Sequence, residues 1–174
     1  MRIYRHWRDV PAQGRGAVVA IGNFDGVHLG HQAVIAEAGR IARARGAPLA
    51  VLTFEPHPRE FFGRTDGPFR LTPFRIKMRE IAGLGVDILY LLRFDRDLAS
   101  LTAEDFIHRL LVEGLGVSHV VVGYDFAFGH ARGGNYAMLQ ENAEAGGYRV
   151  SQVSVAGTNQ GKYSASEARA RLSA

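Results

Sequence analysis

The sequence predicts an α/β fold: a doubly wound, open sheet of five parallel strands with helices packed on both faces. Apolar runs of strand length alternate along the chain with segments whose apolar residues recur at helical spacing. Several of the strand segments are continuous apolar runs, which is typical of strands buried on both faces of a parallel sheet. The 174 residues, 47% of them hydrophobic, suffice for one domain with a substantial core. We therefore expect a single Rossmann-like domain over residues 1–174.

The first strand and the first helix are predicted on either side of a glycine-rich turn. Residues 18–22 form a short, apolar strand, and residues 31–45 form a helix that Gly46 ends. The apolar residues of this helix recur at helical spacing: Val34, Ile35, Ala38, Ile41 and Ala42. Residues 49–54 form the second strand.

Capping signals place the next two helices. Thr72 is a candidate N-cap with Pro73 at the first helical position, and this helix extends to Leu84. The third strand follows at residues 86–92. Thr102 then caps a second helix that reaches about residue 115.

The C-terminal third continues the alternation of strands and helices. The fourth strand is predicted at residues 117–123 and the fifth at residues 148–155, with a helix at residues 135–145 between them. A short final helix is predicted at residues 164–172.

The predicted topology indicates where a ligand would lie. In an open parallel sheet, ligands bind beyond the carboxyl ends of the strands, where the strand order reverses. In a doubly wound sheet of five strands this reversal falls between the first and the fourth strand. These two strands lead into the richest glycine motifs of the chain, GNFDGVHLGH at residues 22–31 and GYDFAFGHARGG at residues 123–134. Topology and composition therefore predict one crevice.

The first motif is typical of a phosphate site. Gly22 and Gly26 permit a tight turn and a close approach of the backbone to a ligand. His28 and His31 lie on one side of the first turn of a helix, where backbone amides and the helix dipole attract anions. Two alternatives remain open: a capped turn with two exposed histidines, and a metal site that also includes Asp25.

At this point the sequence resembles a known family. Residues 22–31 resemble the nucleotidyltransferase signature of the FAD synthetase family, and more narrowly the N-terminal FMN-adenylyltransferase module of prokaryotic bifunctional riboflavin kinase/FAD synthetases. Three further segments extend the resemblance over almost the whole chain: TFEPHP at residues 53–58, Leu71-Thr72-Pro73 with Lys77, and VGYDFAFG at residues 122–129.

The resemblance implies a reaction and a set of site residues. The chain would transfer AMP from ATP to FMN with Mg²⁺, giving FAD and pyrophosphate, by direct attack of the FMN phosphate on the α-phosphorus. The catalytic residues that it implies are His28, His31, Ser164 and Arg169. The implied ATP-binding residues are Gly22, Asn23, Phe24, Asp25, Gly30, Lys162 and Ser166. The implied FMN-binding residues are Pro56, His57, Asp125, Phe126, Phe128 and Gly129. It implies no particular metal ligands.

Some of these residues have a second interpretation from the sequence alone. The phenylalanines at 126 and 128 suit a flavin ring, but they could equally anchor the turn in the core. The carboxylates of Asp25 and Asp125 could lie near a metal or a ribose, or could cap turns.

The chain departs from the family pattern in two places. Family members commonly continue into a C-terminal riboflavin kinase domain, and we expect none within the 174 residues. The family's closing motif, Ser-Ser-Thr-Arg-Ile-Arg, is Ser-Ala-Ser-Glu-Ala-Arg at residues 164–169. Glu167 in this motif either repels the ATP phosphates or completes a capping box with Ser164.

Two other hypotheses about function remain open. The chain could be a catalytically weakened flavin- or nucleotide-binding module. It could also be an adenylyltransferase or cytidylyltransferase for another phosphate-bearing acceptor.

The composition of the chain limits the classes of partner that we expect it to bind. The net charge of +4 suits a phosphate-bearing substrate, but the basic residues are too dispersed to predict nucleic-acid binding. There is no cysteine, no apolar run near the roughly 20 residues of a membrane span, and no signal-peptide core at the N-terminus. We therefore expect a cytoplasmic protein without a membrane partner, and the sequence leaves protein partners open.

Overall fold

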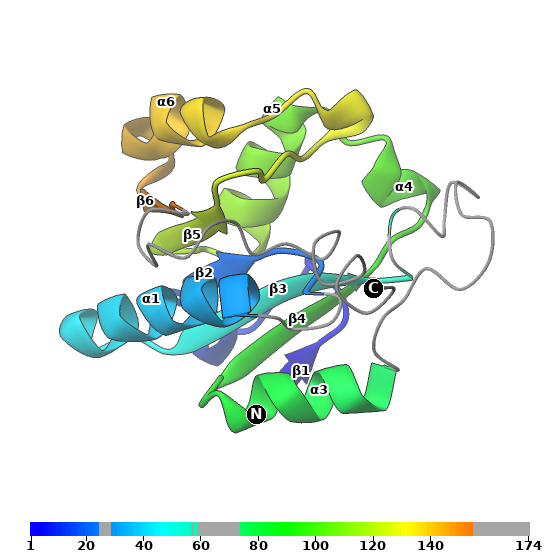
Figure 1. Cartoon of the computed structure of the whole chain (residues 1–174). Coiled ribbons are helices and arrows are strands. Elements are labelled where there is room, and N and C mark those ends of the chain that lie inside the picture. Colours follow the sequence, from blue (N-terminus) through cyan, green and yellow to red (C-terminus); the bar gives the residue numbers. More distant parts are fainter. Residues whose placement is uncertain (25–28, 57, 59–73, 155–174) are drawn as a thin grey trace, which may run out of the picture.

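The computed structural model describes residues 1–24, 29–56, 58 and 74–154 (Figure 1). Its centre is a sheet of six strands in the order β1-β4-β3-β2-β5-β6, in which every neighbouring pair is parallel. The strands are β1 (Arg2–Tyr4), β2 (Val18–Ile21), β3 (Leu49–Glu55), β4 (Ile88–Arg93), β5 (His119–Gly123) and β6 (Arg149–Val153). The predicted doubly wound α/β fold is confirmed.

The prediction of five strands was wrong by one, because it missed β1. This strand has three residues and lies at the edge of the sheet, where Arg2 pairs with Ile88 and Tyr4 with Tyr90. Its residues are exposed or half-buried, so it carries no continuous apolar run. The pairing with β4, which is distant in the sequence, is what makes it a strand.

Helices lie in two layers over the sheet (Figure 1). They are α1 (Leu29–Arg45), α3 (Phe74–Gly83), α4 (Arg96–Ala99), α5 (Ala103–Asp105), the π-helix η2 (Phe106–Gly114) that continues α5, and α6 (Tyr136–Gly146). Two short 3-10 turns are η1 (Ala12–Gly14) and η3 (His130–Arg132). The sequence did not predict the four-residue α4. The predicted final helix at 164–172 and the predicted cap at Thr72 and Pro73 lie outside the described residues.

Alternate residues of β2 face two separate cores, as expected for a strand covered on both sides. Val18 and Ala20 belong to the core under α1 and α3, which includes Val34, Ile35, Ala38 and Ile81. Val19 and Ile21 belong to the core under η2 and α6, which includes Ile107, Leu110, Leu111 and Leu139. The central strand is therefore anchored from both faces, and its carboxyl end is held in a fixed place.

The predicted start at Thr102 and the predicted end of the helix before Gly146 and Gly147 are confirmed within one residue. The Thr102 side chain accepts a hydrogen bond from the Asp105 N–H at 3.1 Å. The Asn135 side chain likewise accepts from the Met138 N–H at 3.1 Å, and Gly147 ends α6 in the left-handed region at φ 73°.

Among the described helices, none combines the length and the apolar character that a membrane crossing requires.

Candidate active site

The strand order reverses at β2, which has β3 on one side and β5 on the other. Ile21 pairs with Leu52 of β3 and with Val122 of β5. The residues that follow in the three strands, Gly22, Thr53 and Gly123, therefore lie at the same level of the carboxyl edge. The predicted reversal between the first and fourth sequence-predicted strands is confirmed, and both glycine motifs begin at it.

The turn after β2 is built around Phe24. The Gly22 N–H donates to the Leu52 carbonyl at 3.2 Å, which extends the pairing with β3 by one residue. Phe24 has a left-handed backbone, with φ 51°, and its side chain is only 1% exposed. A Cβ atom at Gly22 would lie 3.2 to 3.4 Å from the Phe24 ring, so the absence of a side chain at Gly22 lets the ring fold back over the strand end.

His31 lies in the first turn of α1 and contacts this turn. The helix begins at Leu29, two residues before the predicted start, and Gly30 occupies its second position. The half-buried His31 ring meets the Phe24 ring edge-on, with the centroids 5.2 Å apart and an interplanar angle of 76°. Its Nδ1 atom is shielded from solvent. The imidazole is thus placed at the positive end of the helix dipole, where an anion is favoured.

A buried polar cluster holds the same turn from below. The Asn23 carbonyl accepts from the Thr53 hydroxyl at 3.0 Å and from the Lys77 ammonium at 2.5 Å. The Lys77 ammonium also donates to the Thr53 hydroxyl oxygen at 3.1 Å. Thr53 and Lys77 are 1% and 5% exposed, respectively.

The sequence motifs predict no individual role for Lys77, although the helical spacing around it marks it as unusual. Residues 74, 77, 78 and 81 follow the spacing of one helix face, and Phe74, Met78 and Ile81 on that face pack against the core. A lysine at such a position is unusual, since lysines are rarely buried.

The motif after β5 forms a loop that Phe128 anchors. Phe128 is 5% exposed and packs its ring on Phe106 at 5.1 Å and on Phe126 at 5.5 Å between centroids. Its backbone exchanges two hydrogen bonds with Gly134, of 3.1 and 2.8 Å. The structure therefore gives Phe128 the core-anchor position that the sequence left open. Phe126 is half-buried.

Gly129 brings this loop against the start of α5. Its φ is +80°, and a Cβ atom there would lie 2.7 Å from the backbone of Ala103. Only glycine fits such an approach. Asp125, in the same loop, is exposed.

The remaining predicted site residues divide into two groups. Pro56 is half-buried directly after β3, so it shares the carboxyl edge with Gly22 and Gly123. The other predicted residues lie outside the described part of the chain: Asp25, His28, His57, Lys162, Ser164, Ser166 and Arg169. Within the described part, no three His, Asp or Glu residues come together as a metal cluster would require.

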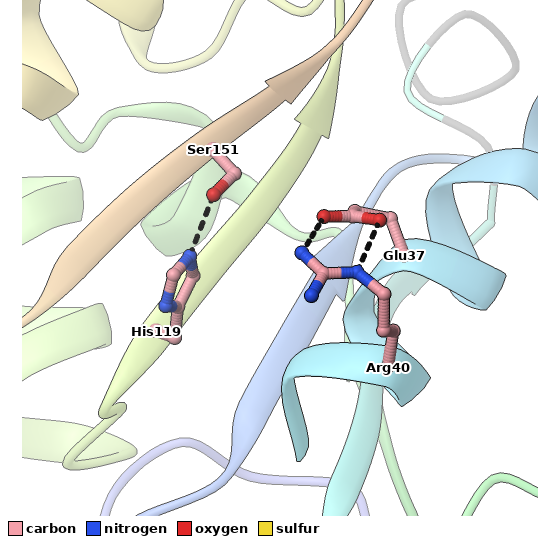
Figure 2. Close-up of polar contacts among 4 residues, drawn as sticks. All are labelled: Glu37, Arg40, His119 and Ser151. Carbon is pink, nitrogen blue, oxygen red and sulfur yellow. Dashed lines mark hydrogen bonds and ion pairs between the residues drawn. The ribbon is translucent and has the colours of Figure 1, made fainter. Parts of the chain in front are cut away.

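A second polar cluster lies at the amino end of β5, away from this edge (Figure 2). There His119 shares a 2.8 Å hydrogen bond between its Nε2 atom and the Ser151 hydroxyl, beside the Glu37–Arg40 ion pair of α1. Burial lowers the pKa of His119, and the positive charges of Arg45 and Arg149 lower it further. Sequence periodicity gave no sign of this cluster.

The fold and the site together define a class. A parallel α/β sheet whose central strand ends in a glycine-containing turn and a helix N-terminus is the architecture of nucleotide-binding domains. Within that class, the model of the FAD synthetase family matches residues 10–167, and the chain belongs to this family. The resemblance predicted from the sequence motifs is confirmed.

Curated relatives agree with this assignment. The bifunctional riboflavin kinase/FMN adenylyltransferase of Escherichia coli (strain K12) is 43% identical over 142 residues, which are 82% of this chain and 45% of the relative. The protein of that name from Pseudomonas fluorescens is 43% identical over 86% of this chain and 48% of its own length. That from Bacillus subtilis (strain 168) is 46% identical over 65% of this chain and 36% of its own length. The chain thus spans about half the length of these relatives, or less.

A solved structure supports the fold. The crystal structure described as a macrolide-efflux protein from Streptococcus pneumoniae superposes with a TM-score of 0.78 at 26% identity. The match covers 96% of this chain and 54% of that chain.

Proposed function

We propose that the chain is an FMN adenylyltransferase, which transfers AMP from ATP to FMN and releases FAD and pyrophosphate. The observation that carries the proposal is the position of His31. It lies in the first turn of α1, beside the turn after β2, in a chain that the FAD synthetase model matches over residues 10–167. A polyphosphate at this place would meet both the helix N-terminus and an imidazole.

The chemistry needs no covalent intermediate. The FMN phosphate attacks the α-phosphorus of ATP, the bond to the β-phosphate oxygen breaks, and pyrophosphate leaves. Catalysis then consists of positioning and of stabilising the charge that builds on the leaving group. We assign that stabilisation to His31, together with His28, Ser164 and Arg169, which lie outside the described residues.

We place ATP over the turn after β2 and FMN toward the ends of β3 and β5. Gly22, Asn23, Phe24 and Gly30 shape the ATP side. On the FMN side, Pro56, Asp125 and the half-buried Phe126 are accessible at the carboxyl edge, and the buried Phe128 supports Phe126 from below. Mg²⁺ would enter with ATP, since this ion usually binds through phosphates and one or two carboxylates. Asp125 is an exposed carboxylate at this edge.

The reaction fits a cytoplasmic location, where ATP is abundant. The chain has no cysteine, so it has no disulfide that the reducing conditions of the cytoplasm would break.

The test is to incubate the purified chain with ATP, FMN and MgCl₂, separating flavins by chromatography and measuring pyrophosphate. We expect FAD and pyrophosphate in equal amounts, with pyrophosphate release dependent on FMN. Binding of FMN and ATP without pyrophosphate release would instead establish a binding module. Pyrophosphate release that requires a different phosphate-bearing acceptor would establish another nucleotidyltransferase.

A further inference from the structure

The buried ammonium of Lys77 lies under the turn that carries Phe24, and not on the surface where ATP would bind. It comes from α3, more than fifty positions along the chain from the Asn23 carbonyl that it contacts. A charged group in such a place requires compensation, and here it donates to that carbonyl and to the Thr53 hydroxyl. The Asn23 carbonyl in turn accepts from both side chains.

These contacts fix the backbone of Phe24. The Asn23 carbonyl and the Phe24 N–H belong to one planar peptide unit, so holding the oxygen also sets the plane from which φ of Phe24 begins. That φ is 51°, in the left-handed region that bulky residues rarely enter. Two donors on one carbonyl oxygen can offset the strain of this conformation.

The position of the Phe24 ring in turn determines the orientation of the His31 imidazole. Its ring is 1% exposed and is confined by Gly22 on one side, and the His31 imidazole packs edge-on against it at 5.2 Å. Edge-to-face contact of this kind has a preferred geometry, so a rotated Phe24 ring would reorient the imidazole.

We propose that Lys77 is a positioning residue that, through the Asn23 carbonyl and Phe24, holds the His31 imidazole in its catalytic orientation. The expected effect on kcat rests on the proposed function, whereas the expected effect on the orientation of the His31 imidazole does not. Lys77 acts without touching ATP or FMN, and Thr53 shares the task.

The principal variant is Lys77→Met, which keeps a long unbranched side chain in the buried position and removes the donor. The matched control is Arg79→Met, which removes an exposed cation from the same helix. We expect Lys77→Met to lower kcat by about 10²-fold, the scale of a small misplacement in an active site, with the KM for FMN changed less than about twofold. We expect Arg79→Met to leave both parameters unchanged.

A double-mutant cycle tests the route of the effect. If Lys77 acts through His31, the Lys77→Met/His31→Ala double variant loses little more kcat than His31→Ala alone. Losses that multiply would show that Lys77 acts independently of His31, and would overturn the proposal.

A measurement without substrates separates this proposal from the proposed function. The ring nitrogen resonances of His31, assigned by their loss in His31→Ala, are recorded by NMR in the substrate-free protein. We expect them to shift in Lys77→Met but not in Arg79→Met. Unchanged resonances would overturn the proposal even in an active enzyme, and shifted ones would support it even if no FAD were made.

A second pair of variants covers the case in which Lys77→Met does not fold. Thr53→Val removes the hydroxyl while keeping the shape, and should shift the His31 resonances and lower kcat in the same direction. Thr53→Ser restores the hydroxyl, and should return the His31 resonances and kcat toward the values of the unmodified protein. Equal behaviour of the valine and serine variants would contradict the role of the Asn23 carbonyl.

Discussion

Burial divides the predicted site residues into those that can meet a ligand and those that hold others in place. His31 and Phe126 are half-buried and Asp125 is exposed, so each can contact a ligand. Phe24 and Phe128 are 1% and 5% exposed, and each supports the ring of a more accessible neighbour. The effect of substitution should therefore differ between the two groups.

Replacing His31 with alanine should reduce turnover sharply while leaving FMN affinity nearly intact. The imidazole lies at the N-terminus of α1, where charge would develop on the leaving pyrophosphate in the proposed reaction, and loss of one preorganised donor costs about 10²–10³ in rate. Steady-state kinetics and calorimetric FMN titration measure the two effects. His108→Ala, an exposed histidine on η2, is the control. Full activity in His31→Ala would show that the motif at residues 22–31 does not contribute to catalysis through His31.

The two phenylalanines after β5 should separate flavin binding from stability. From the sequence, alanine at either position is expected to weaken FMN binding. Because Phe128 is buried between Phe106 and Phe126, Phe128→Ala should also cost about 3–5 kcal/mol in the free energy of unfolding. Phe126→Ala should destabilise less and should weaken FMN binding more than ATP binding. Urea denaturation and calorimetry distinguish the variants, and unchanged FMN affinity in folded Phe126→Ala would place the flavin elsewhere.

His119 should make stability depend on pH. Its folded-state pKa is lowered by burial and by Arg45 and Arg149, so below about pH 6.5 the unfolded chain binds the proton more readily than the folded chain does. The free energy of unfolding should therefore fall as pH decreases from about 7.5 to about 5. His119→Gln, which cannot titrate, should show a smaller fall in urea denaturation at the two pH values. An identical fall in both proteins would contradict this account.

Among the helices and strands, the most informative difference between the predicted and the observed structure is the helix that runs from α5 through η2. The sequence predicts one helix from a Thr102 cap to about residue 115, and the cap is confirmed. The segment Phe106–Gly114 is nevertheless a π-helix, and the Leu115 N–H donates to the Leu110 carbonyl at its end. Helix propensity does not predict this geometry, because π-helices are rare and occur mostly as single-turn bulges within α-helices. Here the π-helix ends against Trp7, whose carbonyl leaves no space for a Cβ at Gly114.

The Thr102 cap should contribute measurably to stability. Its hydroxyl satisfies the Asp105 N–H, one of the donors that a helix start leaves unpaired. Thr102→Ala should lower the free energy of unfolding by about 1 kcal/mol, and Thr102→Ser should restore most of it. Thermal denaturation followed by circular dichroism checks both. Equal stability of the alanine and serine variants would show that the cap contributes nothing.

At the scale of the whole molecule, one sheet joins the two helical layers (Figure 1). Each of β2, β3 and β5 places side chains in both cores, for example Val121 in one and Val122 in the other. Neither layer can therefore lose its packing without exposing apolar side chains of the same strands.

The chain should consequently unfold in a single cooperative transition. Its one tryptophan, Trp7, packs against the core of the η2 layer, so its fluorescence reports on that layer. Far-ultraviolet circular dichroism reports on all helices. We expect the two signals to give the same urea midpoint. Separate midpoints would show that the α1–α3 layer unfolds independently.

Much of this fold followed from local patterns. The five long strands, the capped helices and the reversal of strand order were predicted because buried parallel strands are continuous apolar runs and caps use few residue types. The missed elements, β1 and α4, are three and four residues long and form no such run. Of the site, the glycine motifs and His31 were predictable because turns and helix starts are local features.

Local sequence patterns are sufficient to predict the α/β class, the family and the edge of the sheet at which we propose the active site. Three-dimensional packing alone shows that Phe128 is a buried support, that Gly129 is required against Ala103, and that Lys77 lies under the turn after β2. Apolar periodicity and glycine spacing are patterns of neighbouring residues, so they can be recognised directly in the sequence. The contact of Lys77 with Asn23 joins residues more than fifty positions apart, and it exists only because packing on the sheet brings α3 beneath the end of β2.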